Sequence, residues 1–187
     1  MRVIAGTSRG RRLAGFKGRD VRPTPDRVRE ALFSILQNRL GDFSGLRVLD
    51  LFSGSGALAI EALSRGALSA CLVDNSPDSE KISRQNLERC RLIDKAEITC
   101  QDAFRALRGF PPDCFDLIFL DPPYGRKLAE LAISTISKQG VLRRQGMLCA
   151  ETGADEILPE KIDRLQIFDQ RRYGSVMIHF LCDGGRI

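Results

Sequence analysis

The sequence predicts an α/β protein built on a doubly wound, mostly parallel sheet. Between residues 48 and 150, short apolar runs alternate with longer stretches whose apolar residues recur at helical spacing, and this alternation is typical of consecutive βαβ units. A glycine turn, Gly54-Ser55-Gly56, follows the first apolar run, where open α/β sheets commonly bind their ligands. After residue 165, two strand-like runs flank a polar turn, which predicts a C-terminal antiparallel β-hairpin.

Length and composition favour a single domain. The chain has 187 residues, of which 43% are hydrophobic, enough for one core and few for a second. The sequence contains no internal repeat, low-complexity tract or linker-like segment. We therefore expect one domain over residues 1–187, with a basic N-terminal extension at 1–24 and an α/β core at 25–187.

The first helix of this core has a clear start and end. Thr24 is the predicted N-cap and Pro25 the first helical residue, and apolar residues then recur at helical spacing as far as Gly41. Strands and helices alternate after that point. The expected strands are 48–52, 70–74, 96–100, 115–120 and 147–150, the expected helices are 56–65, 77–91, 102–108 and 127–138, and the hairpin strands are 165–170 and 175–181.

The N-terminal extension carries all of the excess positive charge. Nine Lys or Arg against two Asp give residues 1–29 a net charge of +7, whereas the rest of the chain has 20 basic and 22 acidic residues. Apolar residues alternate near positions 3 and 13 with glycines between them, which predicts a hairpin. A basic hairpin of this kind is suited to contacting the phosphates of a nucleic acid. The candidate phosphate-binding residues are Arg2, Arg9, Arg11, Arg12 and Arg22.

Cysteine and histidine usage indicates no metal site. The six cysteines form no Cys-x-x-Cys pair, and His179 is the only histidine, so the spacing of metal ligands is poor. The cysteines at positions 71, 100, 149 and 182 fall in or at the ends of predicted strands, where we expect reduced, structural thiols that pack as small apolar residues. His179 alternates with apolar neighbours and is expected to be structural.

The sequence also gives no sign of a membrane protein. No run reaches the roughly 18 to 20 apolar residues that span a bilayer, and the first residues lack the apolar stretch of a signal peptide. We expect a cytoplasmic protein.

The glycine turn predicts a cofactor site with two possible occupants. Gly54, Gly56 and the following alanines fit the dinucleotide-binding pattern, and Asp74 ends the next strand, where an acid that binds ribose hydroxyls belongs. NAD and S-adenosylmethionine both carry an adenosine ribose. Asp50 favours S-adenosylmethionine, since an acid just before the turn suits a cationic amine and sulfonium better than a pyrophosphate. Asp102 is placed to accept a hydrogen bond from an adenine amine, and it is an equally good N-cap for the next helix.

The run Asp121-Pro122-Pro123-Tyr124 follows the fourth strand and suits chemistry on a planar amine. The two prolines fix the backbone and leave the Pro122 carbonyl free as an acceptor. Together with the Asp121 carboxylate, it can accept the two hydrogens of an exocyclic NH₂ group, while the Tyr124 ring offers a stacking face for an extruded base. Alone, the run is equally compatible with a rigid turn after a buried strand.

Five segments of the sequence together resemble the bacterial RsmD family. They are 1–6, 9–13, 22–33, 50–56 and 121–124, and the run Arg-Pro-Thr-Pro-Asp-Arg-Val-Arg-Glu-Ala at 22–31 is the most specific. The resemblance runs over essentially the whole chain. It implies a Rossmann-like class I S-adenosylmethionine-dependent methyltransferase with a seven-stranded sheet, acting on the N2 amine of a guanine in 16S ribosomal RNA. Pro25 stands where the family suggests a second threonine.

The resemblance also assigns residues and partners. By position, the family's cofactor loop falls on Phe52, Ser53, Gly54 and Gly56, its ribose acid on Asp74, and its catalytic tetrapeptide on 121–124. The implied cofactor is S-adenosylmethionine, and the implied substrate is small-subunit ribosomal RNA within a ribonucleoprotein particle. We expect the protein to act as a monomer.

Three other functions fit parts of the sequence. An adenine-N6 DNA methyltransferase can use the same tetrapeptide, but 187 residues leave little room for a region that recognises DNA sequence. A glutamine side-chain methyltransferase is disfavoured by the basic extension. A NAD-binding oxidoreductase or regulatory domain rests on the glycine pattern alone.

Overall fold

In a computed structural model of the protein, the described residues are 1–16, 25–124 and 127–184, and within them one eight-stranded sheet has the order β3-β2-β1-β4-β5-β8-β7-β6. The first five strands of this order are parallel to their neighbours, and β8, β7 and β6 are antiparallel. The strands are β1 (Arg47–Leu51), β2 (Ser69–Asp74), β3 (Ala96–Cys100), β4 (Phe115–Leu120), β5 (Leu142–Gly153), β6 (Lys161–Ile162), β7 (Leu165–Tyr173) and β8 (Val176–Asp183). The helices are α1 (Asp26–Leu40), α2 (Ala57–Ser64), α3 (Pro77–Cys90), the 3₁₀ turn Ile93–Lys95, α4 (Ala103–Leu107) and α5 (Leu128–Gln139).

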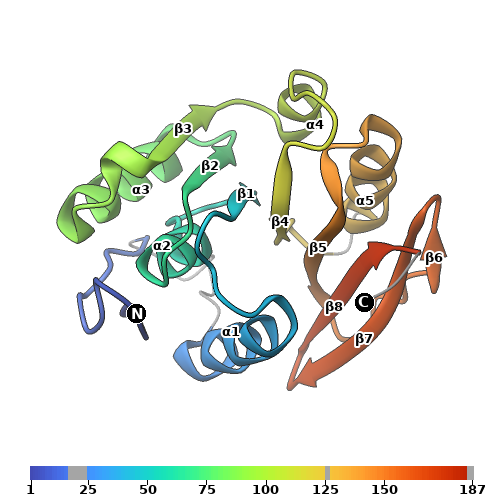
Figure 1. The fold of residues 1–187 in the computed structure, drawn as a ribbon, viewed down its shortest axis with the longest axis horizontal. Helices are drawn as coiled ribbons and strands as arrows, with labels where there is room; N and C mark the ends of the chain where they lie inside the picture. Colours follow the sequence, from blue (N-terminus) through green and yellow to red (C-terminus); the bar gives the residue numbers. More distant parts are fainter. Residues whose placement is uncertain (17–24, 125–126, 185–187) are drawn as a thin grey trace.

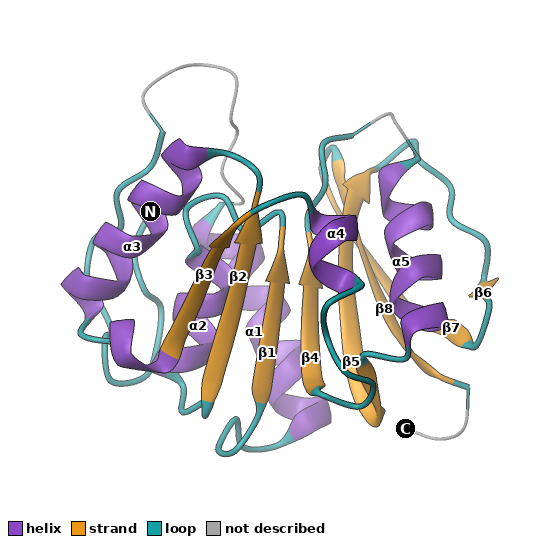
Figure 2. Cartoon of the chain, turned by 90° about the horizontal axis from the view of Figure 1, so that it is seen from above, coloured by secondary structure: helices purple, strands orange, loops and turns teal. Residues whose placement is uncertain are grey.

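Helices cover both faces of the sheet, which confirms the doubly wound fold. Helices α1, α2 and α3 lie on one face, and α4 and α5 lie on the other (Figures 1 and 2). Side chains of each strand alternate between the two layers: Val48 packs in the core under α1 to α3, whereas Leu49 packs in the core under α4 and α5. The antiparallel β7–β8 hairpin confirms the C-terminal prediction.

Local signals in the sequence explain where the helices that border the site begin. Ser76 caps α3 by accepting a hydrogen bond from the Ser79 N–H, with Pro77 at the first helical position. Asp102 caps α4 in the same way by accepting from the Arg105 N–H at 2.9 Å. Both caps follow parallel strands directly, so the helix N-termini lie at the carboxyl edge of the sheet.

Several elements differ in extent from the prediction. Helix α1 begins at Asp26 with Pro25 as its N-cap residue, one residue later than expected, and the predicted cap Thr24 lies outside the described residues. Strand β5 covers 142–153 instead of 147–150, because its polar first half pairs only at residue 142 before a register shift. The two-residue β6 brings the described sheet to eight strands, one more than expected.

The N-terminal extension forms a loop that packs on α2 and α3 and has only part of the predicted hairpin pairing. Within residues 1–16, a single antiparallel bridge joins Arg2 to Arg12. The side chains of Val3 and Leu13 are buried in the core, and their N–H groups donate across the loop to the Arg11 and Met1 carbonyls at 3.0 and 3.1 Å. The arm, as we call residues 1–16, therefore keeps its shape through these internal bonds and through contacts with the helices.

Hydrogen bonds with Glu61, Ser64 and Cys90 are among those that hold the arm against α2 and α3. The buried Glu61 carboxylate accepts from the Ile4 and Ala5 N–H groups at 2.7 and 3.0 Å. The buried Ser8 hydroxyl donates to the Cys90 carbonyl, and its N–H donates to the Ser64 hydroxyl, both at 2.9 Å. These bonds fix the arm beside the glycine turn and make it part of the folded core.

The cysteines are free thiols and do not all behave as predicted. Cys71 and Cys149 are buried, and burial raises the pKa of the Cys71 thiol to about 12. Cys100 is exposed, because it ends the edge strand β3, so its expected role as a packed apolar residue is wrong. His179 is buried on β8 with one ring nitrogen 2.9 Å from the Thr152 hydroxyl.

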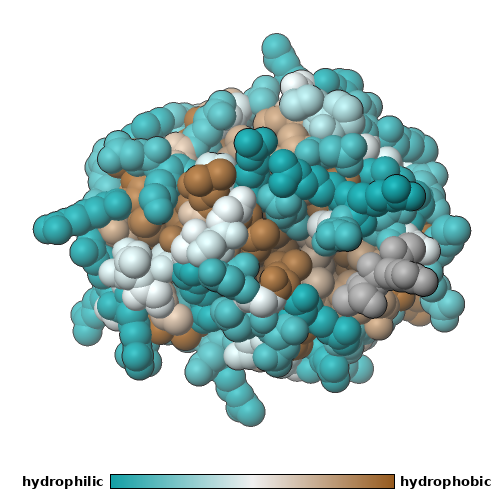
Figure 3. All heavy atoms as spheres, viewed as in Figure 1, coloured by the Kyte–Doolittle hydropathy of each residue, from teal (hydrophilic) through white to brown (hydrophobic). Residues whose placement is uncertain are grey.

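The surface of the protein is mostly hydrophilic on the face seen in Figure 3. Hydrophilic side chains surround small apolar patches on the face that Figure 3 views. Within the described ranges, the structure has no helix long and apolar enough to cross a membrane and no cluster of side chains that could hold a metal ion.

Candidate active site

The carboxyl ends of three adjacent parallel strands bring the predicted site residues together. Asp50 lies near the end of β1, Asp74 ends β2, and Asp121 follows β4, which neighbours β1 on its other side. In register, Leu51 pairs with Val73 on β2 and with Leu120 on β4. Residues far apart in the sequence therefore meet at one edge of the sheet, the usual ligand edge of doubly wound folds.

The glycine turn at this edge has the tight backbone that the sequence predicted. The Gly56 N–H donates to the Ser53 carbonyl at 2.8 Å, and Phe52, Gly54 and Gly56 all have positive φ. A Cβ on Gly56 would lie 2.7 Å from Cδ2 of the buried Leu72. Only glycine fits there, and it lets α2 begin directly against β2.

Asp74 is held by the turn that it faces. One of its oxygens accepts from the Gly54 N–H at 2.9 Å and the other accepts from the Ser76 N–H at 3.0 Å. Each carboxylate oxygen has a second acceptor position. Asp74 is thus oriented by backbone and retains the capacity to accept hydrogen bonds from two ribose hydroxyls.

Asp50 is buried beneath the turn. It is 2% exposed, and its carboxylate accepts from the Ala59 N–H in the first turn of α2 at 3.1 Å. Burial, with a smaller contribution from the charge of Asp74, raises the pKa of Asp50 to about 8. A cationic ligand at this edge stabilises the ionised form of such a carboxyl.

Asp121 lies beside a second acid. Its N–H points to the Leu51 carbonyl at 3.4 Å, which links the tetrapeptide to the end of β1. Desolvation of its carboxyl, followed by the charges of Glu151 and Asp50, raises the pKa of Asp121 well above its ordinary value.

Tyr124 is tied to the same acid and keeps much of its ring accessible. Its hydroxyl donates to the Glu151 carboxylate at 2.6 Å, while the side chain is 48% exposed. Pro122 is buried and Pro123 is exposed. The tetrapeptide thus combines a desolvated carboxyl with an accessible aromatic ring, the pair that chemistry on a planar amine requires.

Glu151, which no sequence motif singled out, interacts with both functional groups of the tetrapeptide. It follows Ala150, where the strand 147–150 was expected to end, and β5 neighbours β4. The same rule that singled out Asp74 and Asp121, an acid at the carboxyl end of a parallel strand, applies to this position.

Asp102 lies at the same edge after β3, is exposed and caps α4. Its helix-capping role is therefore observed. A contact with an adenine amine remains compatible with its second oxygen.

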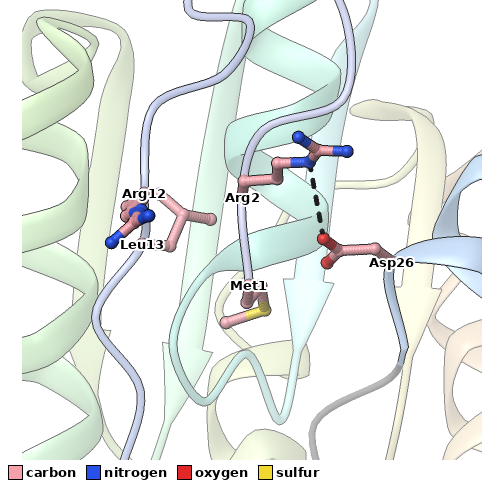
Figure 4. A pocket seen from close by; sticks show the side chains of 5 residues that line it. All are labelled: Met1, Arg2, Arg12, Leu13 and Asp26. Carbon is pink, nitrogen blue, oxygen red and sulfur yellow. Dashed lines mark ion pairs between the residues drawn. The ribbon is translucent and has the colours of Figure 1, made fainter.

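The basic residues of the arm differ in how accessible they are to a nucleic acid. Arg2, Arg9 and Arg12 are exposed, whereas Arg11 is half-buried and donates to the Arg89 carbonyl. The Arg2 guanidinium points towards Asp26 with an N–O distance of 3.8 Å (Figure 4). Arg22 lies outside the described residues.

A further basic residue next to the arm is engaged internally. Arg29 is 1% exposed, pairs with Asp26 at 2.9 Å and donates to the Arg2 carbonyl. Its burial lowers its pKa. Fewer positive charges are therefore available to a polyanion than the net charge of +7 over residues 1–29 suggests.

A pocket of about 360 Å³ lies between the arm and the start of α1. Its lining, shown in Figure 4, consists of Met1, Arg2, Arg12, Leu13 and Asp26. These residues belong to the basic surface and not to the glycine turn or the tetrapeptide.

The residues at the sheet edge fit an S-adenosyl cofactor on chemical grounds. The turn allows close backbone approach at Gly56, Asp74 offers two oriented oxygens, and the buried Asp50 favours a cation nearby. This fit agrees with the preference for S-adenosylmethionine over NAD that Asp50 indicated in the sequence.

Comparisons with known proteins identify the family. The family described as Conserved hypothetical protein 95 matches residues 1–182. YlbH of Bacillus subtilis is 37% identical over 177 residues, which cover 93% of this chain and 94% of YlbH. The Ribosomal RNA small subunit methyltransferase D of Haemophilus influenzae is 35% identical over 165 residues, which cover 86% of this chain and 83% of that protein.

Solved structures agree with these relatives. The Escherichia coli protein yhhF superimposes with a TM-score of 0.85 at 30% identity, covering 100% of this chain and 99% of yhhF. An RNA methyltransferase from Salinibacter ruber in complex with S-adenosyl-L-homocysteine has a TM-score of 0.65 at 17% identity, covering 88% and 95% of the two chains, and shares the fold. The match over residues 1–182 and the relatives above 30% identity establish that this chain belongs to the RsmD family, as its sequence motifs indicated.

Proposed function

We propose that the chain transfers a methyl group from S-adenosylmethionine to the exocyclic N2 amine of a guanine in small-subunit ribosomal RNA, of the guanine 966 type. The observation that carries the proposal is the meeting of the glycine turn and Asp74 with Asp121 and Tyr124 at one edge of the sheet. The name of the Haemophilus influenzae relative supports the small ribosomal subunit as the source of the RNA.

The residues around the glycine turn bind and orient the cofactor. S-adenosylmethionine, when bound, supplies a methyl group activated by its sulfonium. Asp74 accepts hydrogen bonds from the ribose hydroxyls, and the backbone at Gly54 and Gly56 lies against the ligand. Asp50 offers a negative charge to the cationic groups of the cofactor. Phe52 and Ser53 complete the loop, and Asp102 accepts from the adenine amine.

The tetrapeptide half positions the acceptor. The Asp121 carboxylate and the Pro122 carbonyl accept the two hydrogens of the guanine amine, which turns the nitrogen lone pair towards the methyl carbon. Pro123 stiffens the turn, and Tyr124 stacks on the extruded base. Stacking of this kind offsets about 1–3 kcal/mol of the few kcal/mol needed to take a base out of its stack.

Proton transfer completes the reaction. As the nitrogen–carbon bond forms and the carbon–sulfur bond breaks, positive charge develops on N2, and the ionised Asp121 stabilises it and takes the proton. The pKa of Asp121 is raised in the free protein by desolvation and by Glu151 and Asp50. A cationic ligand beside these acids lowers it again, so that Asp121 becomes ionised when the cofactor is present.

The arm provides a positively charged surface for the RNA. The exposed Arg2, Arg9 and Arg12 contact phosphates, together with the half-buried Arg11 and with Arg22, which lies outside the described residues. We further propose that the whole chain works as one domain and as a monomer. It acts in the cytoplasm on a ribonucleoprotein particle of the small subunit.

Nucleoside mass spectrometry of ribosomal RNA tests the proposal. In a strain lacking the gene, small-subunit RNA loses one N2-methylguanosine, which the wild-type gene restores and an Asp121→Ala variant does not. An unchanged nucleoside content refutes the proposal. Loss of N6-methyladenine from DNA instead identifies the DNA methyltransferase alternative.

A further inference from the structure

One buried amide, Asn86 on α3, joins the arm to the glycine turn. The side chain is fully buried, and its oxygen accepts from the Ala14 N–H at 2.7 Å. Its amide nitrogen donates to the Ala14 carbonyl and to the Ser55 carbonyl, both at 3.0 Å. All the hydrogen-bonding capacity of this amide nitrogen is used on the backbone of two other segments.

An aromatic side chain of the arm also lies beside the turn. A Cβ placed on Gly54 would lie 3.7 Å from Cε2 of Phe16, an ordinary van der Waals distance. The turn is thus held from two sides, since Asp74 accepts the Gly54 N–H on one side and Asn86 donates to the Ser55 carbonyl on the other.

The arm is anchored firmly enough to act on the turn. Its other end is fixed to α2 by Glu61 and to α3 by Ser8, and Arg89 of α3 donates to the Arg12 carbonyl at 3.1 Å. Residues 12–16 are therefore bonded to α3 at both Arg12 and Ala14, and Asn86 of the same helix is bonded to the turn.

We propose that Asn86 and Phe16 couple the arm to the cofactor turn, so that RNA on the arm and S-adenosylmethionine at the turn strengthen each other's binding. The coupling rests on the proposed function, because it needs RNA to contact the arm. Asn86 and Phe16 are positioning residues in this scheme and take no part in methyl transfer.

The physical basis is the cost of holding the turn in its binding shape. Positive φ at Phe52, a residue with a Cβ, is a costly backbone conformation that persists only when the surroundings impose it. In this scheme, Asn86 at the Ser55 carbonyl and Phe16 beside Gly54 limit the turn to this shape, and RNA that binds the arm strengthens both contacts. Coupling between two ligands is reciprocal, and values of about 5-fold to 150-fold are typical.

Equilibrium dialysis of radiolabelled S-adenosylhomocysteine tests the coupling without turnover. The dissociation constant is measured with and without small ribosomal subunits from a strain lacking the gene, and RNA binding is measured in parallel by filter retention. The variants are Asn86→Asp, which keeps the shape and removes both donors, and Phe16→Ala, which changes only a half-buried side chain of the arm. Thr7→Ala is the control, since Thr7 contacts the Ser64 carbonyl of α2 at 3.4 Å and not the turn.

For the wild type and Thr7→Ala, we expect the subunits to tighten cofactor binding by about fivefold or more. In Asn86→Asp and Phe16→Ala, we expect binding of the cofactor alone to weaken by about tenfold; in Asn86→Asp the reason is the loss of the one hydrogen bond that reaches the turn, to the Ser55 carbonyl. In both variants, we expect the subunits to give no tightening of cofactor binding. Equal tightening in Phe16→Ala and the wild type overturns the proposal, even if Asn86→Asp fails to fold. RNA binding that leaves cofactor affinity unchanged in the wild type overturns the coupling alone, whereas absence of RNA binding overturns the proposed function with it.

Discussion

Gly6 is the point at which the arm meets α2 most closely, and a methyl group there tests how the arm is held. A Cβ on Gly6 would lie 1.8 Å from the Ser64 carbonyl oxygen and 2.7 Å from the Arg65 nitrogen. Both atoms belong to helix backbone and cannot move aside. Gly6→Ala must therefore lift the arm from α2.

The size of the effect follows from the backbone strain and from the hydrogen bonds that break. At Gly6, φ is +81°, so alanine costs about 1–2 kcal/mol in backbone strain alone. Lifting the arm also breaks the bond from the Thr7 N–H to the Ser64 carbonyl at 2.8 Å and the bond from the Ser8 N–H to the Ser64 hydroxyl. Two such bonds contribute about 1–3 kcal/mol, and Glu61 is separated from two further donors.

Gly10→Ala is the matched control for this change. Gly10 lies in the same arm with φ of +80°, and a Cβ there meets nothing within 4 Å. In urea unfolding, we expect Gly6→Ala to lose at least about 2 kcal/mol more of the free energy of unfolding than Gly10→Ala, or about 4–8 °C more in Tm for a chain of this length. Equal losses in the two variants would show that the arm is not seated on α2 and would refute the reasoning.

Three further predictions concern the candidate active site and the arm. Asp74→Ala should weaken S-adenosylhomocysteine binding in calorimetric titration by about 1.5–3 kcal/mol, the value of hydrogen bonds to a charged group. Wild-type affinity in this variant would show that Asp74 does not bind the cofactor. Neutralising Arg9, Arg11 and Arg12 should flatten the log–log salt dependence of RNA binding by roughly 0.7–0.9 for each phosphate that the variant no longer neutralises, while the exposed Arg144→Gln serves as a control for general charge. Glu151→Gln keeps an acceptor for Tyr124 and removes a charge that raises the pKa of Asp121. The acidic limb of single-turnover methyl transfer should therefore move to lower pH, and a limb that stays in place contradicts the role of Glu151.

Most of the fold could be predicted from the sequence because its elements are marked locally. The runs that became β1, β2 and β4 are apolar over most of their length, as expected for strands covered on both faces. The caps of α3 and α4 and the glycine at the end of α1 are residues with strong positional preferences. The cofactor turn and the tetrapeptide were found for the same reason, since both are short and contiguous.

The remaining features depend on contacts between distant segments. Glu61 and Asn86 look like ordinary polar residues of amphipathic helices, yet both are fully buried and bind the backbone of the arm. The polar start of β5 and the two-residue β6 carry no periodic signal. A hairpin was expected for the arm because its glycines suggest a turn, and the bridge between Arg2 and Arg12 and the backbone bonds beside it show part of that pairing. The burial of Val3 and Leu13 against the helices depends on contacts with distant segments.

The acids at the sheet edge give a physical reason to prefer one cofactor over the other. Asp50 and Asp121 each have a raised pKa, because a charge is costly in these desolvated positions and a second acid lies nearby. The pyrophosphate of NAD would bring a further negative charge to this edge and increase that cost. S-adenosylmethionine brings an ammonium and a sulfonium, which offset it and favour the ionised form of Asp121. In the proposed mechanism, the cation that binds the site therefore also prepares the carboxylate that accepts the proton, so cofactor binding and acceptor activation depend on the same charges.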